Sequence, residues 1–238
     1  KGTGKDRLNS QLAEAFSAGV QNFLAVTGDK SDKHPAPHGL QRNPVYTPGY
    51  LDSVEIIRHI HNSDYDCVLG AGVNPYKYNA ADQYLQYYKM MRKIASGAAF
   101  ITTHIGWDMK KLQELQWFLQ MRECDIPAIA RLALLSGEKA RHNAENPFPG
   151  VHLSRPFAAM LERECSVNET QLLAAQLKRI ALQVAGCRLL GYSGVQLAGI
   201  RDERTLDMVL NSIKQTMTEL PSYNEWLTAW KEHHGEID

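Results

Sequence analysis

Apolar residues recur along the chain in two alternating patterns, one with helical spacing and one with short strand-like runs. Residues 6–20 carry apolar side chains at helical spacing, and Gly19 is suited to end that helix. The apolar run at residues 22–26 predicts a buried strand. The same alternation continues to the C-terminus. Further predicted helices cover residues 50–63, 80–97, 108–126, 168–186 and 201–217, and further predicted strands cover residues 65–75, 98–104, 127–135 and 192–199.

Strands that alternate with helices through short connections predict parallel strands joined by helical crossovers, and therefore an α/β fold. Five strands are too few for a closed eight-stranded barrel, and an open doubly wound sheet fits the periodicity equally well. Residues 135–166 have no regular pattern. The main domain is expected over residues 1–220, with a C-terminal helical tail over residues 221–238.

Composition places few constraints on function. The 238 residues contain 26 Lys plus Arg and 26 Asp plus Glu, which argues against a general attraction to nucleic acid or to anionic membranes. No apolar stretch approaches the length of a membrane span, and no signal peptide is visible. The four cysteines are widely spaced, without the spacing of a structural zinc site, and indicate reduced thiols in a cytoplasmic protein.

Polar or small residues follow several predicted strands. The first strand runs into Thr27, Gly28 and Asp29, and then into a Pro-rich loop at residues 30–49. In a parallel sheet all carboxyl ends share one edge, so these strand ends are expected to converge on a ligand site. The residues at the other strand ends are Gly70, Ala71, Gly72, Asn74, Thr102, Thr103, His104, Gln196 and Gly199.

Other motifs are weaker. "GAGVNP" lacks the third glycine of a dinucleotide fingerprint, and "KGTGKD" lacks most of a phosphate-binding loop. His59 and His61 lie two residues apart on a helix, so their rings point apart and metal binding is not expected. The adjacent His233 and His234 predict a solvated pair.

The third predicted helix carries an aromatic and methionine-rich face, for which packing is favoured over ligand stacking. Lys93 follows this face, and its long side chain could reach a phosphate, although a surface position is usual for lysine. The residues of the face are Tyr84, Tyr87, Tyr88, Met90 and Met91.

Several segments together resemble methylenetetrahydrofolate reductases, flavoproteins built on a (β/α)₈ barrel. The segments are "NFLAVTGD", "VYTPGYLDSVEII", "GAGVNP", "KIASGAAFITTHIGWD" and "LLGYSGVQLAG", and the resemblance runs from about Arg7 to Ser212. It implies a barrel of this type whose first three strands, with the family's general-acid glutamate, are not in this sequence.

The resemblance also implies roles for particular residues. Asp29 matches the catalytic aspartate near the pyrimidine end of the flavin. His104 stands where the family has a folate-binding glutamine, and together with Gln196 and Arg201 it is expected to bind substrate. No metal is implied. Residues expected to bind FAD, with FMN the less favoured cofactor, are Thr27, Gly28, Asp29, Tyr50, Ser53, Gly72, Asn74 and Lys93.

The implied reaction is hydride transfer through flavin to 5,10-methylenetetrahydrofolate, which gives 5-methyltetrahydrofolate. The electron donor is expected to be a reduced nicotinamide or a protein, and a homo-oligomer or a partner subunit is possible. Two alternatives stay open from the residues: a flavin-free, folate-dependent methyl-transfer protein, and a non-catalytic paralogous subunit. Neither nucleic acid nor membrane is expected as a partner.

Overall fold

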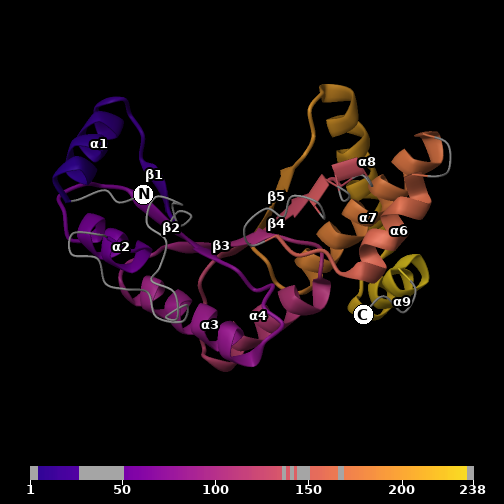
Figure 1. Cartoon of the computed structure of the whole chain (residues 1–238), viewed down its shortest axis with the longest axis horizontal. Helices are drawn as coiled ribbons and strands as arrows, with labels where there is room; N and C mark the ends of the chain where they lie inside the picture. Colours follow the sequence, from indigo (N-terminus) through magenta and orange to yellow (C-terminus); the bar gives the residue numbers. More distant parts are fainter. Residues whose placement is uncertain are drawn as a thin grey trace, which may run out of the picture. The chain divides into compact units, whose positions relative to one another are not determined.

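The computed structural model describes residues 5–26, 51–135, 138–139, 142–143, 151–165 and 169–234. Helices and strands alternate as the apolar pattern predicts (Figure 1). The strands are β1 (Asn22–Ala25), β2 (Val68–Val73), β3 (Phe100–Ile105), β4 (Ala128–Ala133) and β5 (Gly194–Ala198). The helices are α1 (Lys5–Ser17), α2 (Ser53–His61), α3 (Ala80–Ala95), α4 (Met109–Met121), α6 (Arg155–Cys165), α7 (Glu169–Leu189), α8 (Glu203–Glu219) and α9 (Tyr223–His234).

The five strands form one parallel sheet in the order β1-β2-β3-β4-β5. A doubly wound sheet reverses its strand order at a switch point, whereas neighbouring strands of a (β/α) barrel follow one another in sequence. The sequential order therefore decides between the two architectures that the periodicity left open. The fold is α/β and is consistent with part of a TIM-type barrel.

The chain divides into two compact units. Unit 1 comprises Lys1–Gly72 and Leu85–Ile101, and unit 2 comprises Val73–Tyr84 and Thr102–Asp238. The boundary cuts through α3 and β3, so each of these elements contributes to both units. The predicted division into residues 1–220 and 221–238 follows a different criterion and stays a prediction.

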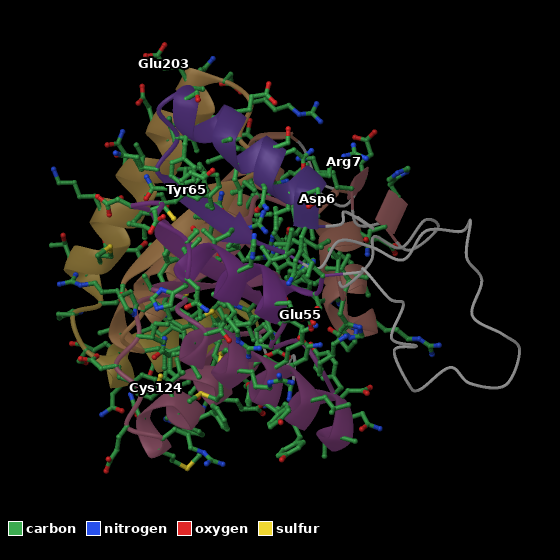
Figure 2. All side chains as sticks on the ribbon, turned by 90° about the vertical axis from the view of Figure 1, so that its left-hand side faces the viewer. Asp6, Arg7, Glu55, Tyr65, Cys124 and Glu203 are labelled. Carbon is green, nitrogen blue, oxygen red and sulfur yellow. The ribbon has the colours of Figure 1, made fainter. Side chains whose placement is uncertain are left out.

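In unit 1, α2 begins with a capping box. The Asp52 side chain accepts hydrogen bonds from the backbone N–H groups of Val54 and Glu55, and the Glu55 side chain accepts one from the Asp52 N–H. At the other end of the unit, the rings of Phe16 and Tyr65 stack with centroids 4.0 Å apart. Charged side chains of the first turn of α1, such as Asp6, extend into solvent (Figure 2).

The expectation that residues 22–26 form a buried strand was wrong in its burial. The strand forms as β1, but Leu24 is 44% and Val26 57% exposed. Because β1 is an edge strand that pairs only with β2, alternate side chains on one of its faces have little covering them in the described structure.

Unit 2 is organised around α7, which packs against β4 and β5 and against α4, α6, α8 and α9. Of these helices, α6, α7, α8 and α9 lie close to one another in Figure 1. The strand face toward the helices is fully buried at Ala128, Ala130 and Leu132, whereas the alternate residues of β4 are only partly buried. Residues 135–166, which lack periodicity, contain a helix that the sequence pattern missed, α6.

The expected solvated pair His233 and His234 was a second error. His234 is 6% exposed, its ring stacks on Trp230 with centroids 3.6 Å apart, and its Nδ1 lies 3.2 Å from the Trp230 carbonyl oxygen. Burial lowers the pKa of His233 to about 4 and that of His234 to about 3. The chain turns back through α9 onto α7, and this contact covers the pair.

The aromatic face of α3 is divided between core and surface. Tyr87 and Met90 are buried as packing residues, whereas Tyr84 is 65% and Tyr88 52% exposed. Within the described residues, no helix combines the length and the apolar character needed to cross a bilayer.

Candidate functional site

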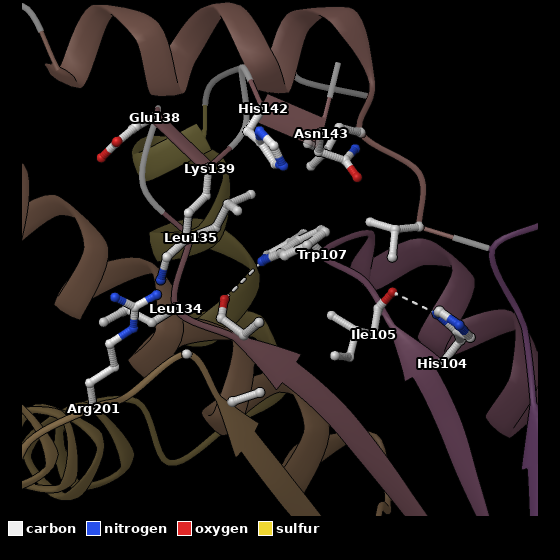
Figure 3. A pocket seen from close by; sticks show the side chains of 15 residues that line it. His104, Ile105, Trp107, Leu134, Leu135, Glu138, Lys139, His142, Asn143 and Arg201 are labelled. Carbon is white, nitrogen blue, oxygen red and sulfur yellow. Dashed lines mark hydrogen bonds between the residues drawn. The ribbon is translucent and has the colours of Figure 1, made fainter. Parts of the chain in front are cut away.

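A cavity of about 810 Å³ lies in unit 2 at the carboxyl ends of β3, β4 and β5 (Figure 3). This is the edge at which barrels of parallel strands place their ligand sites. The cavity is lined by His104, Ile105, Trp107, Ala133, Leu134, Leu135, Glu138, Lys139, His142, Asn143, Val151, Leu153, Ala198, Gly199 and Arg201.

One wall of the cavity is apolar and rigid. Trp107 follows β3, is 9% exposed, and donates a hydrogen bond from Nε1 to the Ala133 carbonyl oxygen over 2.9 Å. Gln183 of α7 donates from Nε2 to the Trp107 carbonyl oxygen over 3.2 Å. Trp107 also packs in one core cluster with Leu135 and Phe157. An indole held in this way offers a flat apolar face to a planar ligand.

A second wall comes from the segment before α6. Val151 and Leu153 line the cavity, and His152 between them points elsewhere, since its ring contacts Tyr78 with centroids 4.5 Å apart. The Tyr78 hydroxyl donates to the Asp108 carboxylate over 3.0 Å, and Lys111 lies 5.3 Å from the Tyr78 ring centroid. These contacts anchor the wall to the N-terminus of α4.

The polar residues of the cavity are mainly cationic or neutral. Arg201 comes from the segment after β5, and Lys139 from the segment after β4 (Figure 3). His104 is half-buried at the end of β3, with Nδ1 3.5 Å from the Ile105 carbonyl oxygen. Glu138 is the one carboxylate among the described lining residues, so the cavity favours a ligand with negative or acceptor groups.

Gly199 allows β4 and β5 to approach closely at the cavity edge. Its φ is +82°, and a Cβ at this position would lie 2.8 Å from the Leu134 carbonyl oxygen. The Leu134 N–H donates to the Ala198 carbonyl oxygen over 2.9 Å. A side chain at residue 199 would therefore strain the backbone and separate the two strand ends.

Two of the three predicted substrate-binding residues, His104 and Arg201, line this cavity. Gln196 does not line it, but lies on β5 opposite Arg131 of β4, two residues before the lining residue Ala198. The sequence pattern missed Trp107 and Lys139, because a single tryptophan after a strand and a lysine in a non-periodic segment give no local signal of a site.

The predicted flavin-binding residues fall into three groups: residues outside the described part of the chain, one residue in unit 2, and three in unit 1. Thr27, Gly28, Asp29 and Tyr50 lie outside the described residues. Asn74, in unit 2, accepts a hydrogen bond from the Tyr76 N–H through its side-chain oxygen over 3.0 Å.

The other three, Ser53, Gly72 and Lys93, belong to unit 1. Ser53 is fully buried, and Lys93 is 8% exposed and donates from Nζ to the Gly72 carbonyl oxygen at the carboxyl end of β2. Burial, followed by the positive charge of Lys89, lowers the pKa of Lys93 to about 8. Lys93 is thus a buried cation rather than a surface lysine.

This lysine provides a test of whether the described residues fit a flavin. An ammonium group has three N–H donors, and one of them is directed to Gly72, which leaves donors for a polar group of a ligand at this strand end. A Cβ at Gly72 would meet only Val26, at 3.8 Å, so the glycine itself is not required by close packing. Lys93 and Gly72 are therefore compatible with a bound flavin. Among the described residues no cluster of His, Cys, Asp and Glu could hold a metal ion.

The sequence matches the family model of methylenetetrahydrofolate reductase over residues 3–196. The chain belongs to this family. None of the curated proteins matches the sequence. Among solved structures, an uncharacterized protein from Clostridium thermocellum that binds two copies of 5-methyl-5,6,7,8-tetrahydrofolic acid is 12% identical, with a TM-score of 0.49, over 72% of this chain and 61% of that chain. The apo form of the homocysteine methyltransferase MmuM from Escherichia coli is 14% identical, with a TM-score of 0.32, over 85% of this chain and 82% of that one.

Proposed function

We propose that this member of the methylenetetrahydrofolate reductase family binds a reduced folate in the cavity at the ends of β3, β4 and β5. The observation that carries the proposal is the cavity itself, with an apolar indole wall for a flat ring and cationic or neutral polar groups around it. His104 and Arg201 are the residues assigned to the folate. A histidine at residue 104 can donate to or accept from a pterin edge, according to its tautomer.

The finer proposal is flavin-dependent reduction of 5,10-methylenetetrahydrofolate to 5-methyltetrahydrofolate. A bound FAD supplies the group that accepts and passes on a hydride. Lys93 donates a hydrogen bond to the cofactor, and Asp29 sets the charge near its pyrimidine edge. Thr27, Gly28, Tyr50, Ser53, Gly72 and Asn74 complete the proposed contacts.

The test of folate binding is a titration of the purified chain with 5-methyltetrahydrofolate, followed by quenching of tryptophan fluorescence. Saturable binding that Arg201→Met weakens at least tenfold supports the proposal. Arg188 is an exposed arginine at the end of α7, and Arg188→Met serves as the matched control. This control is expected to leave the affinity unchanged. Absence of binding by the wild-type chain overturns the proposal.

The test of the flavin is the visible absorption spectrum after incubation with FAD and removal of the excess. A bound-flavin spectrum that a reduced nicotinamide bleaches and a methylene-folate restores supports the reductase. Asp29→Asn then shifts the reduction potential of the bound flavin. A colourless chain that still binds 5-methyltetrahydrofolate supports the alternative, a flavin-free folate-dependent protein.

A further inference from the structure

Below the cavity, the inner face of the sheet in unit 2 carries a layer of polar residues. Side chains alternate along a strand, so residues two apart share one face. His104, Ala133 and Ala198 line the cavity, and the residues two positions earlier on the same three strands are Thr102, Arg131 and Gln196. These three positions form the layer directly beneath the cavity lining, about 7 Å further down the strands.

The backbone brings the three strands into register at this layer. Arg131 and Gln196 are paired across β4 and β5, and Ala133 and Ala198 are paired above them. On the other side of β4, the Arg131 N–H donates to the Thr103 side-chain oxygen of β3 over 2.9 Å. Thr102 directly precedes Thr103 on that strand, so it also lies beside Arg131. Arg131, Gln196 and Thr102 are therefore neighbours across three adjacent strands.

Two atoms of the layer are buried without a hydrogen-bond partner. They are Nε of Arg131 and Oγ1 of Thr102, and Thr102 is 5% exposed. Within the described part of the chain, the Arg131 guanidinium makes no ion pair. Arg131 as a whole is only partly buried, and Gln196 is exposed. The guanidinium remains charged, and leaving its buried Nε–H donor unpaired is costly unless an acceptor compensates it.

The layer above leaves room for that compensation. Ala133 and Ala198 have the smallest side chains that a lining layer can have short of glycine, so the long side chains of Arg131 and Gln196 can extend past them toward the cavity. An arginine fork, an amide and a hydroxyl form a set of donors that suits a carboxylate or the N–H and C=O edge of a lactam.

We infer that Arg131, with Thr102 and Gln196, forms the floor of the folate cavity and holds an oxygen of the ligand that bears full or partial negative charge. This inference rests on the proposed folate site. The oxygen belongs either to the pterin lactam or to a carboxylate of the glutamate tail, and both offer the same acceptor chemistry to the arginine.

The experiment compares wild type with Arg131→Met, which keeps an unbranched side chain out to the ε position and removes the guanidinium charge. Dissociation constants are measured for 5-methyltetrahydrofolate, for 6-methyltetrahydropterin, which has no carboxylate, and for 4-aminobenzoyl-glutamate, which has no pterin. A hydrogen bond to a charged group corresponds to about a tenfold or larger change in affinity. Arg131→Met is therefore expected to weaken 5-methyltetrahydrofolate at least tenfold and to weaken only one of the two fragments by a similar factor. The weakened fragment identifies the oxygen.

Two further variants sharpen the test. Arg131→Lys recovers part of the lost affinity, and Gln196→Ala weakens the same fragment as Arg131→Met. Arg188→Met, on the exposed end of α7, serves as the matched control and changes none of the three affinities.

The melting temperature without ligand separates this role from a structural one. Removal of a partly buried charge that has no protein partner leaves the melting temperature of the free protein unchanged or raises it. A lower melting temperature, a failure to fold, or wild-type affinity for all three ligands in Arg131→Met overturns the inference and leaves the folate site intact. If wild type binds none of the three, the proposed function and the inference both fail.

Discussion

Two groups of polar side chains in unit 2 differ in how their members are paired. In the cluster between α6, α7 and α9, here called the helix cluster, Arg179 is 3% exposed, makes an ion pair with Glu164 and lies over the Phe157 ring. His234 in the same cluster contacts the Trp230 ring and carbonyl.

The side chains of the cavity floor have no such partners. Arg131 has no ion pair among the described residues, and Oγ1 of Thr102 has no hydrogen-bond partner there. Some atoms of the helix cluster are also unpaired, among them Nε of Arg179, but Arg179 and Glu164 form an ion pair with each other. A buried charge with a partner in the protein stabilises the fold, whereas a partly buried charge with an unpaired donor points to a ligand.

The largest loss of stability is expected from a substitution that breaks the Arg179–Glu164 ion pair of the helix cluster. Glu164→Gln removes the charge that faces Arg179 and leaves a buried cation uncompensated, which costs about 3–5 kcal/mol. Urea unfolding followed by circular dichroism measures the loss. Glu162→Gln, on the exposed side of the same helix, is the control and stays within about 0.5 kcal/mol of wild type. If Glu164→Gln lowered the free energy of unfolding by less than about 1 kcal/mol, the Arg179–Glu164 pair would not be an important stabilising contact.

The next effect concerns Lys93 in unit 1, whose ammonium donates to the Gly72 carbonyl oxygen. Because its pKa is lowered from 10.5 to about 8, the unfolded chain binds more protons than the folded one between these two values. Stability is therefore expected to rise with pH from about 8 to 10.5, by roughly 3 kcal/mol at most. Lys93→Met flattens this rise, and Lys5→Met, an exposed lysine of α1, preserves it. An equally steep rise in Lys93→Met would assign the proton to another group.

The dependence of stability on pH in the acid range tests the buried histidine His234. The pKa of His234 is lowered from 6.5 to about 3 by burial, so the unfolded chain binds the extra proton as the pH falls below 6.5. Stability is therefore lost between pH 6.5 and pH 3, by roughly 3 kcal/mol at pH 4. His234→Phe keeps a ring against Trp230 and should show a shallower loss in urea titrations at pH 6.5 and 4. His61→Phe, exposed on α2, is the control. The same acid slope in His234→Phe and wild type contradicts the prediction.

The smallest effect on stability is expected at the cavity, where side chains serve a ligand. His104→Gln restores the residue type that the family resemblance implies, and it should change the free energy of unfolding by less than about 0.5 kcal/mol. Affinity for 5-methyltetrahydrofolate should be kept or improved, as measured by fluorescence titration. A loss of several kcal/mol in stability would instead place His104 with the helix cluster as a residue of the fold.

The sequence alone determined the elements and the family. Apolar periodicity located every strand of the described chain and most of its helices, because that spacing is a local property of the polypeptide. Asp52 occupies the N-cap position of α2 for an equally local reason, because its carboxylate reaches the N–H groups two and three residues ahead. The motifs that resemble methylenetetrahydrofolate reductases agree with the family match over residues 3–196.

The tertiary structure decided which residues share a space. Strand order, the contact of Trp107 with Ala133, the burial of His234, and the placement of Arg131 below the cavity all join positions that are distant in the sequence. Local periodicity carries no information on such pairs. A single arginine in a strand gives no local sign of a site, and only the neighbouring strands show that Arg131 lies beneath a cavity with a buried, unpaired Nε. The fold can therefore be predicted from local patterns, whereas the functional site depends on contacts that form only in the folded chain.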